Sequence, residues 1–200
     1  MKKIESIYRE ILYKALELKE FELTQSELSK KLGISLSIVN SAVKRLNSIG
    51  SVRIQQRGFR VIDIKKILYF WASVRNLEKD IIYKTRIEVP VREIERIMPN
   101  LVFTCYTGYK FMFNDVPADY SEVYVYADEG ELQILKERIK KISNIHKKEN
   151  LYVLKKDPLL ILYKNIPLAQ IFADLWNVKD WYAKDFIDAF EKKLKEQEKK

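Results

Sequence analysis

Residues 24–52 read TQSELSKKLGISLSIVNSAVKRLNSIGSV, and this stretch decides the fold of the first part of the chain. Thr24 is a suitable helix N-cap, and Glu27, three residues later, completes a capping-box pattern. Leu28 and Leu32 then share one face of a short helix over residues 25–32. Because Gly33 follows directly, we expect the helix to end there with a left-handed residue.

A further helix is predicted over residues 36–49, immediately after this turn. Ser35 can cap its start, and Gly50 closes its end. Its apolar residues recur at helical spacing and predict a buried stripe, which consists of Val39, Ala42, Val43 and Leu46. The two helices are therefore expected to pack as a pair around a tight turn.

Further elements flank this pair of helices. Apolar residues recur at helical spacing over residues 4–19, which predicts a preceding helix. Residues 52–54 and 59–62 read as two strands around the turn Gln55-Gln56-Arg57-Gly58. The predicted order is helix, helix, tight turn, helix and hairpin. A connecting helix over residues 64–79 follows, and no linker rich in proline, glycine or serine marks a boundary.

The stretch from Leu23 to Ile62 resembles the winged helix-turn-helix family of DNA-binding modules. The signals that match are the short second helix, Gly33-Ile34-Ser35, Ser37-Ile38-Val39-Asn40, Val43-Lys44-Arg45-Leu46 and Ile49-Gly50-Ser51-Val52. The resemblance covers about a fifth of the chain. It implies a winged-helix domain over residues 1–65 that binds double-stranded DNA, although some winged helices bind only protein.

The charge of this region is of one sign. Residues 28–62 contain no acidic residue and seven bases, which are Lys30, Lys31, Lys44, Arg45, Arg53, Arg57 and Arg60. Residues 66–200 are nearly balanced, with 24 bases and 21 acids, whereas the whole chain carries a net charge of +9. A cationic field on a small folded segment favours a polyanionic partner.

The candidate DNA contacts come from the hairpin and from the helix predicted over residues 36–49, which is the third along the chain. If the apolar stripe packs inward, Ser37, Asn40, Ser41 and Lys44 line the opposite face of the helix. Asn40 can pair bidentately with adenine, and Ser35 lies where a helix start favours a phosphate. The predicted DNA-binding residues are Ser35, Ser37, Asn40, Ser41, Lys44, Arg45, Arg53, Gln55, Gln56, Arg57 and Arg60. The alternative for each of them is an ordinary solvated surface position.

The second half, residues 66–200, predicts an α/β domain. Helices are expected over residues 90–98, 130–142, 168–176 and 180–194. Strands are expected over residues 101–106, 122–126, 150–154 and 159–163. Aromatic residues near the end have helical spacing and predict core packing; they are Trp176, Trp181, Tyr182, Phe186 and Phe190.

Parts of this second half resemble AbiEi-type antitoxin regulators. The matching stretches are residues 101–126, Pro167 to Leu175, and Ala183-Lys-Asp-Phe186. In that group a winged helix precedes an α/β domain related to nucleotidyltransferases. The resemblance implies a regulator of its own toxin–antitoxin operon whose second domain binds a toxin protein.

The residues argue against nucleotidyl transfer. An active enzyme of that fold needs a Gly-Ser pair for the triphosphate and two carboxylates one residue apart on the next strand for magnesium. Here Gly108 precedes Tyr109, and Glu122 is followed along its strand by Tyr124 and Tyr126. We therefore expect no catalysis, no cofactor and no metal, and we interpret the second half as a scaffold.

Composition narrows the class of protein further. One cysteine, Cys105, excludes an internal disulfide framework, and with one histidine, His146, it cannot form a usual zinc site. No apolar run approaches the roughly 20 residues that span a bilayer. These features predict a cytoplasmic protein without a membrane partner. The abundance of isoleucine, lysine and glutamate leans toward a thermophilic source.

The sequence therefore predicts an α/β (α+β) protein with a winged helix-turn-helix domain followed by an α/β domain that is nucleotidyltransferase-like. Its predicted function is sequence-specific transcriptional regulation, as a repressor and by resemblance as an antitoxin-type regulator. Two alternatives stay open: a nucleotidyltransferase-family enzyme, and a winged-helix adaptor that binds protein and never DNA. The operator, the effector and the oligomeric state are left open.

Overall fold

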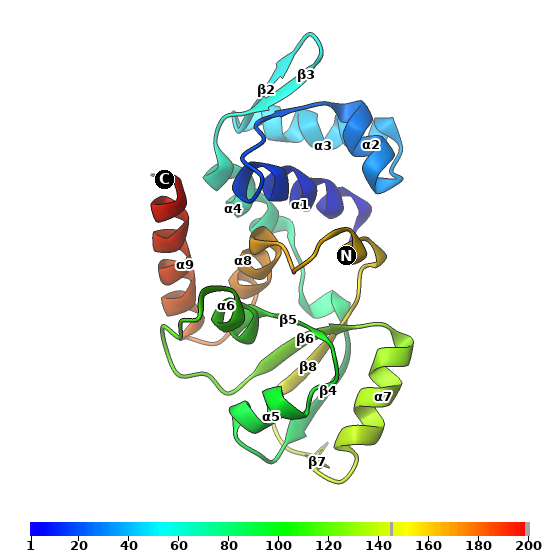
Figure 1. Ribbon diagram of the computed structural model, residues 1–200, viewed down its shortest axis with the longest axis vertical. Helices are drawn as coiled ribbons and strands as arrows, with labels where there is room; N and C mark the ends of the chain where they lie inside the picture. The colour runs from blue at the N-terminus through cyan, green and yellow to red at the C-terminus, as the bar shows by residue number, and fades with distance from the viewer. Residues whose placement is uncertain (145, 199–200) are drawn as a thin grey trace. The chain divides into compact units, whose positions relative to one another are not determined.

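The computed structural model describes residues 1–144 and 146–198, which form a mixed α/β protein with two sheets. The chain divides into two compact units (Figure 1). The first consists of Met1–Arg75 and Ile161–Ala173, and the second of Asn76–Leu160 and Asp174–Lys200. The sequence placed a boundary near residue 65, whereas the first unit continues for ten more residues and takes in a distant segment.

The first unit contains four helices from the beginning of the chain and a small sheet. In chain order these elements are α1 (Lys3–Leu16), β1 (Glu22–Leu23), α2 (Gln25–Leu32), α3 (Leu36–Ser48), β2 (Val52–Gln55), β3 (Gly58–Val61) and α4 (Ile64–Val74). The later segment adds the end of the 3₁₀ turn η2 (Pro158–Leu162) and the first residues of α8 (Leu168–Trp176).

The turn between α2 and α3 forms as local chemistry dictates. The Thr24 hydroxyl accepts the Glu27 N–H at 3.2 Å, and Gly33 ends α2 with φ +61°. The Ser29 hydroxyl then donates to the carbonyl of Ile34 at 2.7 Å, which holds the turn closed. Ser35 occupies the N-cap position of α3, but its exposed side chain makes no capping hydrogen bond, so the expected side-chain cap is wrong.

A three-stranded antiparallel sheet of order β1-β3-β2 completes the first part of this unit. The predicted hairpin is present and pairs Arg53 with Arg60. Its strands extend one residue further into the turn than expected, because Gln55 pairs with Gly58. The short strand β1 was not predicted, because two residues carry no periodic signal. It adds the third strand by pairing Leu23 with Phe59.

Segment 161–173 is anchored in the first unit by side chains of α1 and α4. The Tyr163 hydroxyl donates to Glu10 at 2.8 Å, and Glu17 accepts the Leu168 N–H at 3.0 Å. The rings of Tyr69 and Phe172 meet edge to face with centroids 5.4 Å apart. Buried polar bonds and an aromatic contact therefore make this segment part of the unit's core.

The second unit is built around a five-stranded sheet of order β5-β6-β8-β4-β7. Its elements are η1 (Glu78–Asp80), β4 (Ile81–Ile87), α5 (Val91–Ile97), β5 (Val102–Thr104), α6 (Cys105–Phe113), β6 (Val123–Ala127), α7 (Glu129–Ile139), β7 (Ser143–Asn144), β8 (Leu151–Lys155) and α9 (Ala183–Glu198). Strands β6 and β8 are parallel and are joined through α7, whereas the other pairs are antiparallel.

The two faces of this sheet differ in chemistry. One face is aliphatic: Val125 and Val153 pack against Ile94 of α5 and Leu135 of α7. The other face carries aromatic and polar side chains, which include Thr104, Tyr124, Tyr126 and Tyr152. Alternation along the strands separates these two sets, because successive side chains point to opposite faces.

Two predicted strands differ from the structure, and one long strand was not predicted. The strand expected over residues 101–106 ends at Thr104, and α6 begins at Cys105 because the aromatic residues that follow have helical spacing and pack on Phe186. The strand expected over residues 159–163 is a 3₁₀ turn in which Ile161 is 87% exposed. Strand β4 was missed; its alternation is masked because Ile81, Ile82 and Tyr83 are all apolar.

Candidate nucleic-acid interface

Helix α3 is held by its apolar stripe. Val39, Ala42, Val43 and Leu46 are buried, with at most 1% of each side chain exposed, which confirms the predicted inward face. Burial of four side chains on one stripe fixes the rotation of the helix about its axis. Turning the helix would expose these side chains to water, at a cost of about 1.5–3 kcal/mol for each large apolar residue. The opposite face is therefore held toward solvent.

That exposed face is hollowed. A cavity of about 510 Å³ is lined by Leu36, Ser37, Asn40, Ser41 and Lys44. Three of these polar side chains are exposed and Asn40 is half-buried. The hollow therefore presents two hydroxyls, an amide that both donates and accepts, and one cation, with no acidic group among its lining residues.

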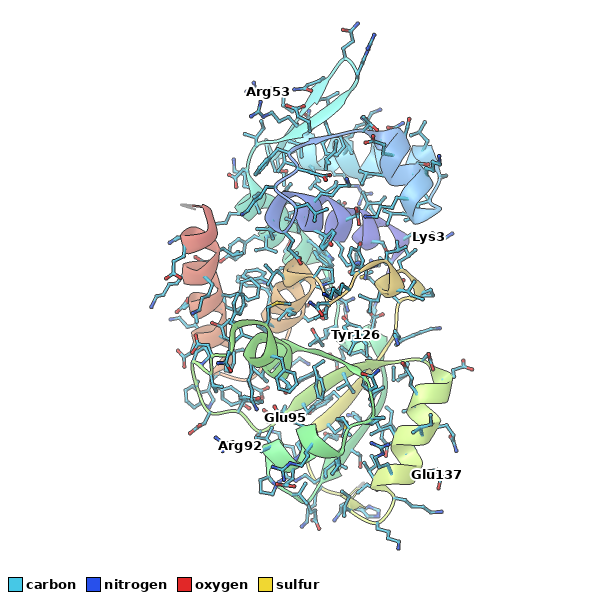
Figure 2. All side chains as sticks on the ribbon, viewed as in Figure 1. Lys3, Arg53, Arg92, Glu95, Tyr126 and Glu137 are labelled. Carbon is cyan, nitrogen blue, oxygen red and sulfur yellow. The ribbon has the colours of Figure 1, made fainter. Side chains whose placement is uncertain are left out.

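The hairpin β2–β3 projects beyond α3 in the first unit, as Figure 1 shows. Gln55, Gln56 and Arg57 at its tip are exposed, and Figure 2 shows Arg53 beside the hairpin. Gly58 is indispensable at the end of this turn, because its φ is +140° and an added Cβ would lie 2.3 Å from the carbonyl oxygen of Leu23. A residue with a side chain would therefore disturb the contact between the end of this turn and β1.

Polar bonds join the hairpin to α3. The Ser51 hydroxyl donates to the carbonyl of Leu46 at 2.8 Å, and Asn47 accepts the N–H of Ile54 at 3.4 Å. The carbonyl of Ser51 also accepts the N–H groups of Ile62 and Asp63. Because both ends of the hairpin are tied to the residues that end α3, the helix and the hairpin present one continuous surface.

The structure brings most of the predicted contact residues onto this surface, with two qualifications. Arg60 forms an exposed ion pair with Glu22 at 3.4 Å, which offsets part of its charge. Arg45 lies beside α1: burial raises the pKa of the Tyr8 hydroxyl, and the nearby Arg45 guanidinium opposes that rise. Arg45 therefore diverges from the hollow lined by Ser37 and Lys44.

The remaining members of the set are exposed, except for the half-buried Asn40. Ser35 lies at the first turn of α3, next to the hollow, and its hydroxyl is open to solvent. Lys31, another base of the acid-free stretch, is bonded to the buried carboxylate of Glu10 at 2.7 Å. Its role is structural, because that bond compensates a carboxylate whose side chain is fully buried.

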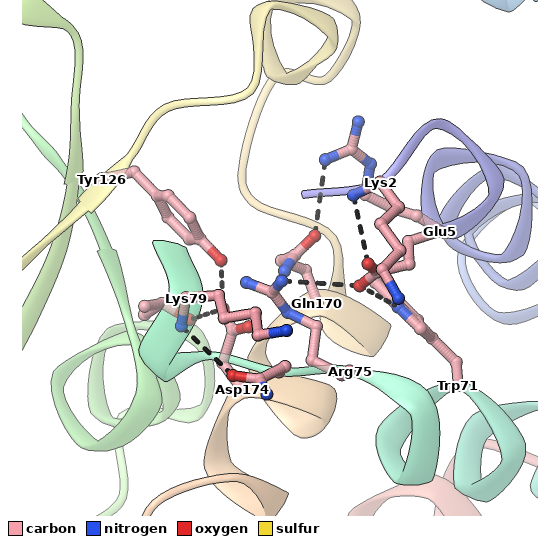
Figure 3. A network of polar contacts seen from close by, with 11 residues as sticks. Lys2, Glu5, Trp71, Arg75, Lys79, Tyr126, Gln170 and Asp174 are labelled. Atoms are coloured by element: carbon pink, nitrogen blue, oxygen red, sulfur yellow. Dashed lines mark hydrogen bonds and ion pairs between the residues drawn. The ribbon is translucent and has the colours of Figure 1, made fainter. Parts of the chain in front are cut away.

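Buried charges fix the helices behind this surface. In Figure 3 the Glu5 carboxylate accepts from the Trp71 indole at 3.3 Å and from Arg75 at 3.4 Å. Arg9 donates to Gln170 at 3.4 Å and lies over the ring of Tyr163. These bonds link α1 to α4 and to segment 161–173, so they stabilise the body that carries α3.

Sequence reasoning missed two apolar members of the surface. Leu36 is 45% exposed at the rim of the hollow, and Ile54 is 44% exposed on β2. Their positions were readable as a signal: both fall outside the buried stripe of their own element. Exposed apolar side chains beside polar ones suit contact with thymine methyl groups or sugars.

The second unit holds a buried polar centre of another kind. Asp174 is fully buried and accepts hydrogen bonds from Thr104 at 2.7 Å and Tyr126 at 2.6 Å. Cys105 is a buried free thiol. Within residues 1–144 and 146–198, no group of three or more histidine, cysteine or acidic side chains could hold a metal ion.

A helix that is both long and apolar enough to cross a membrane is not found in the described part of the chain. Comparison with protein-family models, with curated proteins and with solved structures finds no match to this chain.

Proposed function

We propose that this chain is a sequence-specific DNA-binding regulator whose first unit is a winged helix-turn-helix. The observation that carries the proposal is the continuous surface of α3 and the hairpin, in a stretch without acidic residues. Ser37, Asn40 and Lys44 point outward from a helix whose other face is buried, and Arg57 lies at the hairpin tip. An α-helix of this size fits the major groove of a duplex.

The roles of the side chains follow from their chemistry. Asn40 presents an amide that can make two hydrogen bonds to adenine, so we propose that it makes the base-specific contact. Lys44, Arg53 and Arg57 are proposed to bind phosphate, which positions the protein without selecting sequence. The side chains of Ser37 and Ser41 are small, which lets α3 approach the DNA closely. Their hydroxyls can form hydrogen bonds with phosphates or base edges.

The test is binding to duplexes recovered by selection from a random pool. Five phosphate contacts predict that log K falls with log salt at a slope of about −4.5. We expect Asn40→Ala to weaken the selected duplex by about five- to 100-fold and unrelated duplexes hardly at all, since a bidentate base contact contributes about 1–3 kcal/mol. Arg57→Ala is expected to weaken all duplexes alike and to flatten the slope by about 1.

The matched control is Lys184→Ala, which removes an exposed cation from the second unit without touching α3 or the hairpin. It should leave affinity and slope unchanged. Duplex binding that is insensitive to both Asn40→Ala and Arg57→Ala between about 50 and 200 mM salt would show that this surface is not the DNA-binding surface. The absence of any salt-dependent duplex binding would favour an adaptor that binds protein.

A narrower proposal comes from the resemblance of the second half to AbiEi-type antitoxin regulators. On that resemblance alone, the chain would repress its own toxin–antitoxin operon and bind the toxin through its second unit. The selected duplex decides this point: it should occur upstream of the chain's own coding region. A site found only elsewhere would leave DNA binding intact and refute self-regulation.

A further inference from the structure

A second hollow lies in the second unit, and none of its lining residues is among those proposed to touch DNA. Its volume is about 550 Å³, and all the residues that line it belong to that unit. Strands β4, β6 and β8 form its floor, and residues 177–180 form part of its wall. This volume is within the range of about 300–1,000 Å³ that is usual for small-molecule sites.

Two tyrosines are stacked on the floor. Tyr124 of β6 and Tyr152 of β8 are register partners, and their rings are nearly parallel, with centroids 4.6 Å apart and an interplanar angle of 9°. The Tyr152 hydroxyl donates to the carbonyl of Glu149 at 3.3 Å, which restrains the ring. The floor is therefore a preformed aromatic platform.

The hollow borders Tyr152 on the side of β4. Strand β8 lies between β6 and β4, so Tyr124 covers the ring from one side and the second face looks toward β4. Lys84 of β4 is the register partner of Tyr152, and both Lys84 and Ile81 line the hollow there. A planar ring that enters on this side would stack on Tyr152, as aromatic pairs prefer offset stacking.

The charges around the hollow favour an anion. Three lysines line it against two acids, Glu78 and Asp180. Lys179 is paired with the exposed Glu78 at 3.1 Å and Lys84 with the half-buried Glu149 at 2.9 Å, and such solvent-accessible pairs contribute little. Lys148 is exposed, and its positive charge opposes the rise in the pKa of Asp180, which also lines the hollow.

Asp180 is engaged within the protein. Its carboxylate accepts the Tyr106 hydroxyl at 3.1 Å. Burial raises the pKa of Asp180, and the neighbouring Glu122 carboxylate raises it further. The acid that faces the hollow is therefore already bonded, and it opposes an incoming anion less than a free carboxylate would.

We propose that this hollow binds a small planar aromatic molecule that carries an anionic group, with the ring on Tyr152 and the anion at Lys84 and Lys148. The binding site lies wholly within the second unit and does not depend on DNA binding. Carboxylate and phosphate share the recognising chemistry, so the anion's source is settled by experiment.

The experiment is isothermal titration calorimetry of the full chain with 4-hydroxybenzoate and AMP. The neutral counterparts 4-hydroxybenzamide and adenosine, and inorganic phosphate, are titrated in parallel. We expect at least one aromatic anion to bind, its neutral counterpart to bind about tenfold or more weakly, and phosphate alone to show no saturable heat. The anion that binds identifies the source as carboxylate or phosphate.

Two variants place the binding in this hollow. Lys148→Gln should weaken the aromatic anion about tenfold or more, because it removes a charge-assisted bond. Tyr152→Leu should weaken it about threefold to tenfold by removing the stacking platform. Lys140→Gln, an exposed lysine at the end of α7 that does not line the hollow, is the matched control and should change nothing.

The proposal is overturned if neither aromatic anion binds at millimolar concentration, if phosphate alone binds as well as they do, or if Lys148→Gln binds like the unchanged chain. Should Tyr152→Leu fail to fold, Lys148→Gln decides by itself, since an exposed lysine is not needed for folding.

Discussion

Replacement of Gly58 by alanine should destabilise the first unit far more than the same change at Gly33. Both glycines have positive φ values, +140° for Gly58 and +61° for Gly33. They differ in their surroundings: an added Cβ at Gly33 meets nothing within 4 Å, whereas at Gly58 it would lie 2.3 Å from the Leu23 carbonyl oxygen. The left-handed conformation of Gly33 is open to alanine at a modest cost, whereas both the φ of Gly58 and the contact with Leu23 oppose a side chain there.

The magnitude follows from two terms at Gly58. Its φ costs a residue with a side chain about 1–3 kcal/mol. The Cβ and the Leu23 oxygen must also move apart by roughly 0.7 Å to reach 3.0 Å, which disturbs the pairing of Leu23 with Phe59. Loss of one or two backbone hydrogen bonds adds about 1–2 kcal/mol. We therefore expect about 2–5 kcal/mol for Gly58→Ala and about 1–2 kcal/mol for Gly33→Ala.

The assay is urea unfolding followed by the fluorescence of Trp71, which is buried in the first unit. The chain has three tryptophans, and Trp176 and Trp181 are 45% and 83% exposed, so a W176F/W181F background leaves Trp71 as the reporter at little cost. Phe59 is fully buried, so the hairpin cannot detach without opening the core that Trp71 reports. If Gly58→Ala is no more destabilising than Gly33→Ala, the contact with β1 does not constrain the turn.

Three further outcomes are expected. Burial raises the pKa of Glu17 above its ordinary 4.5, so the folded protein keeps this carboxyl protonated to a higher pH than the unfolded chain does. The contribution of Glu17 to the free energy of unfolding therefore falls as pH rises just above 4.5. Glu17→Gln should flatten this pH dependence, as measured by denaturant midpoints at pH values from 4.5 upward. Tyr163→Phe, which removes the bond to the buried Glu10, should cost about 1.5–3 kcal/mol in urea unfolding, and an unchanged midpoint would show that the bond contributes nothing. Phe186→Ala should lower the free energy of unfolding by about 3–5 kcal/mol, because the ring is fully buried. Trp181→Ser, at an exposed position, should change it by no more than about 0.5 kcal/mol. Equal shifts in thermal unfolding for the two variants would contradict the packing described for the second unit.

Local signals predicted the first unit well where they were strong. Thr24 caps α2 and Gly33 ends it, and the buried stripe of α3 is the one that helical spacing indicated. The same spacing placed Ser37 and Lys44 on the exposed face, so much of the candidate site was readable from periodicity. Positions whose partners lie far away in sequence were not: Arg45 lies beside Tyr8, and Lys31 pairs with Glu10.

The wrong predictions concern residues whose structure depends on contacts with other elements of the fold. Cys105 and Tyr106 read as strand because the run before them is apolar, but Tyr106 and Tyr109 pack on Phe186 at helical spacing, and this contact favours α6. Trp181 has the spacing of a core residue and is nevertheless largely exposed. Periodicity indicates which residues share a face, and it does not indicate whether another element covers that face.

Segment 161–173 has a consequence for how the molecule is made. Because Tyr163 and Leu168 bond to α1, the first unit lacks part of its core until the ribosome has synthesised most of the chain. Domains usually fold in order as they emerge, from the N-terminus onward. Here the segment that completes the first unit follows the entire sheet of the second unit in sequence, so a nascent chain that has reached only residue 75 lacks the partners of Glu10 and Glu17.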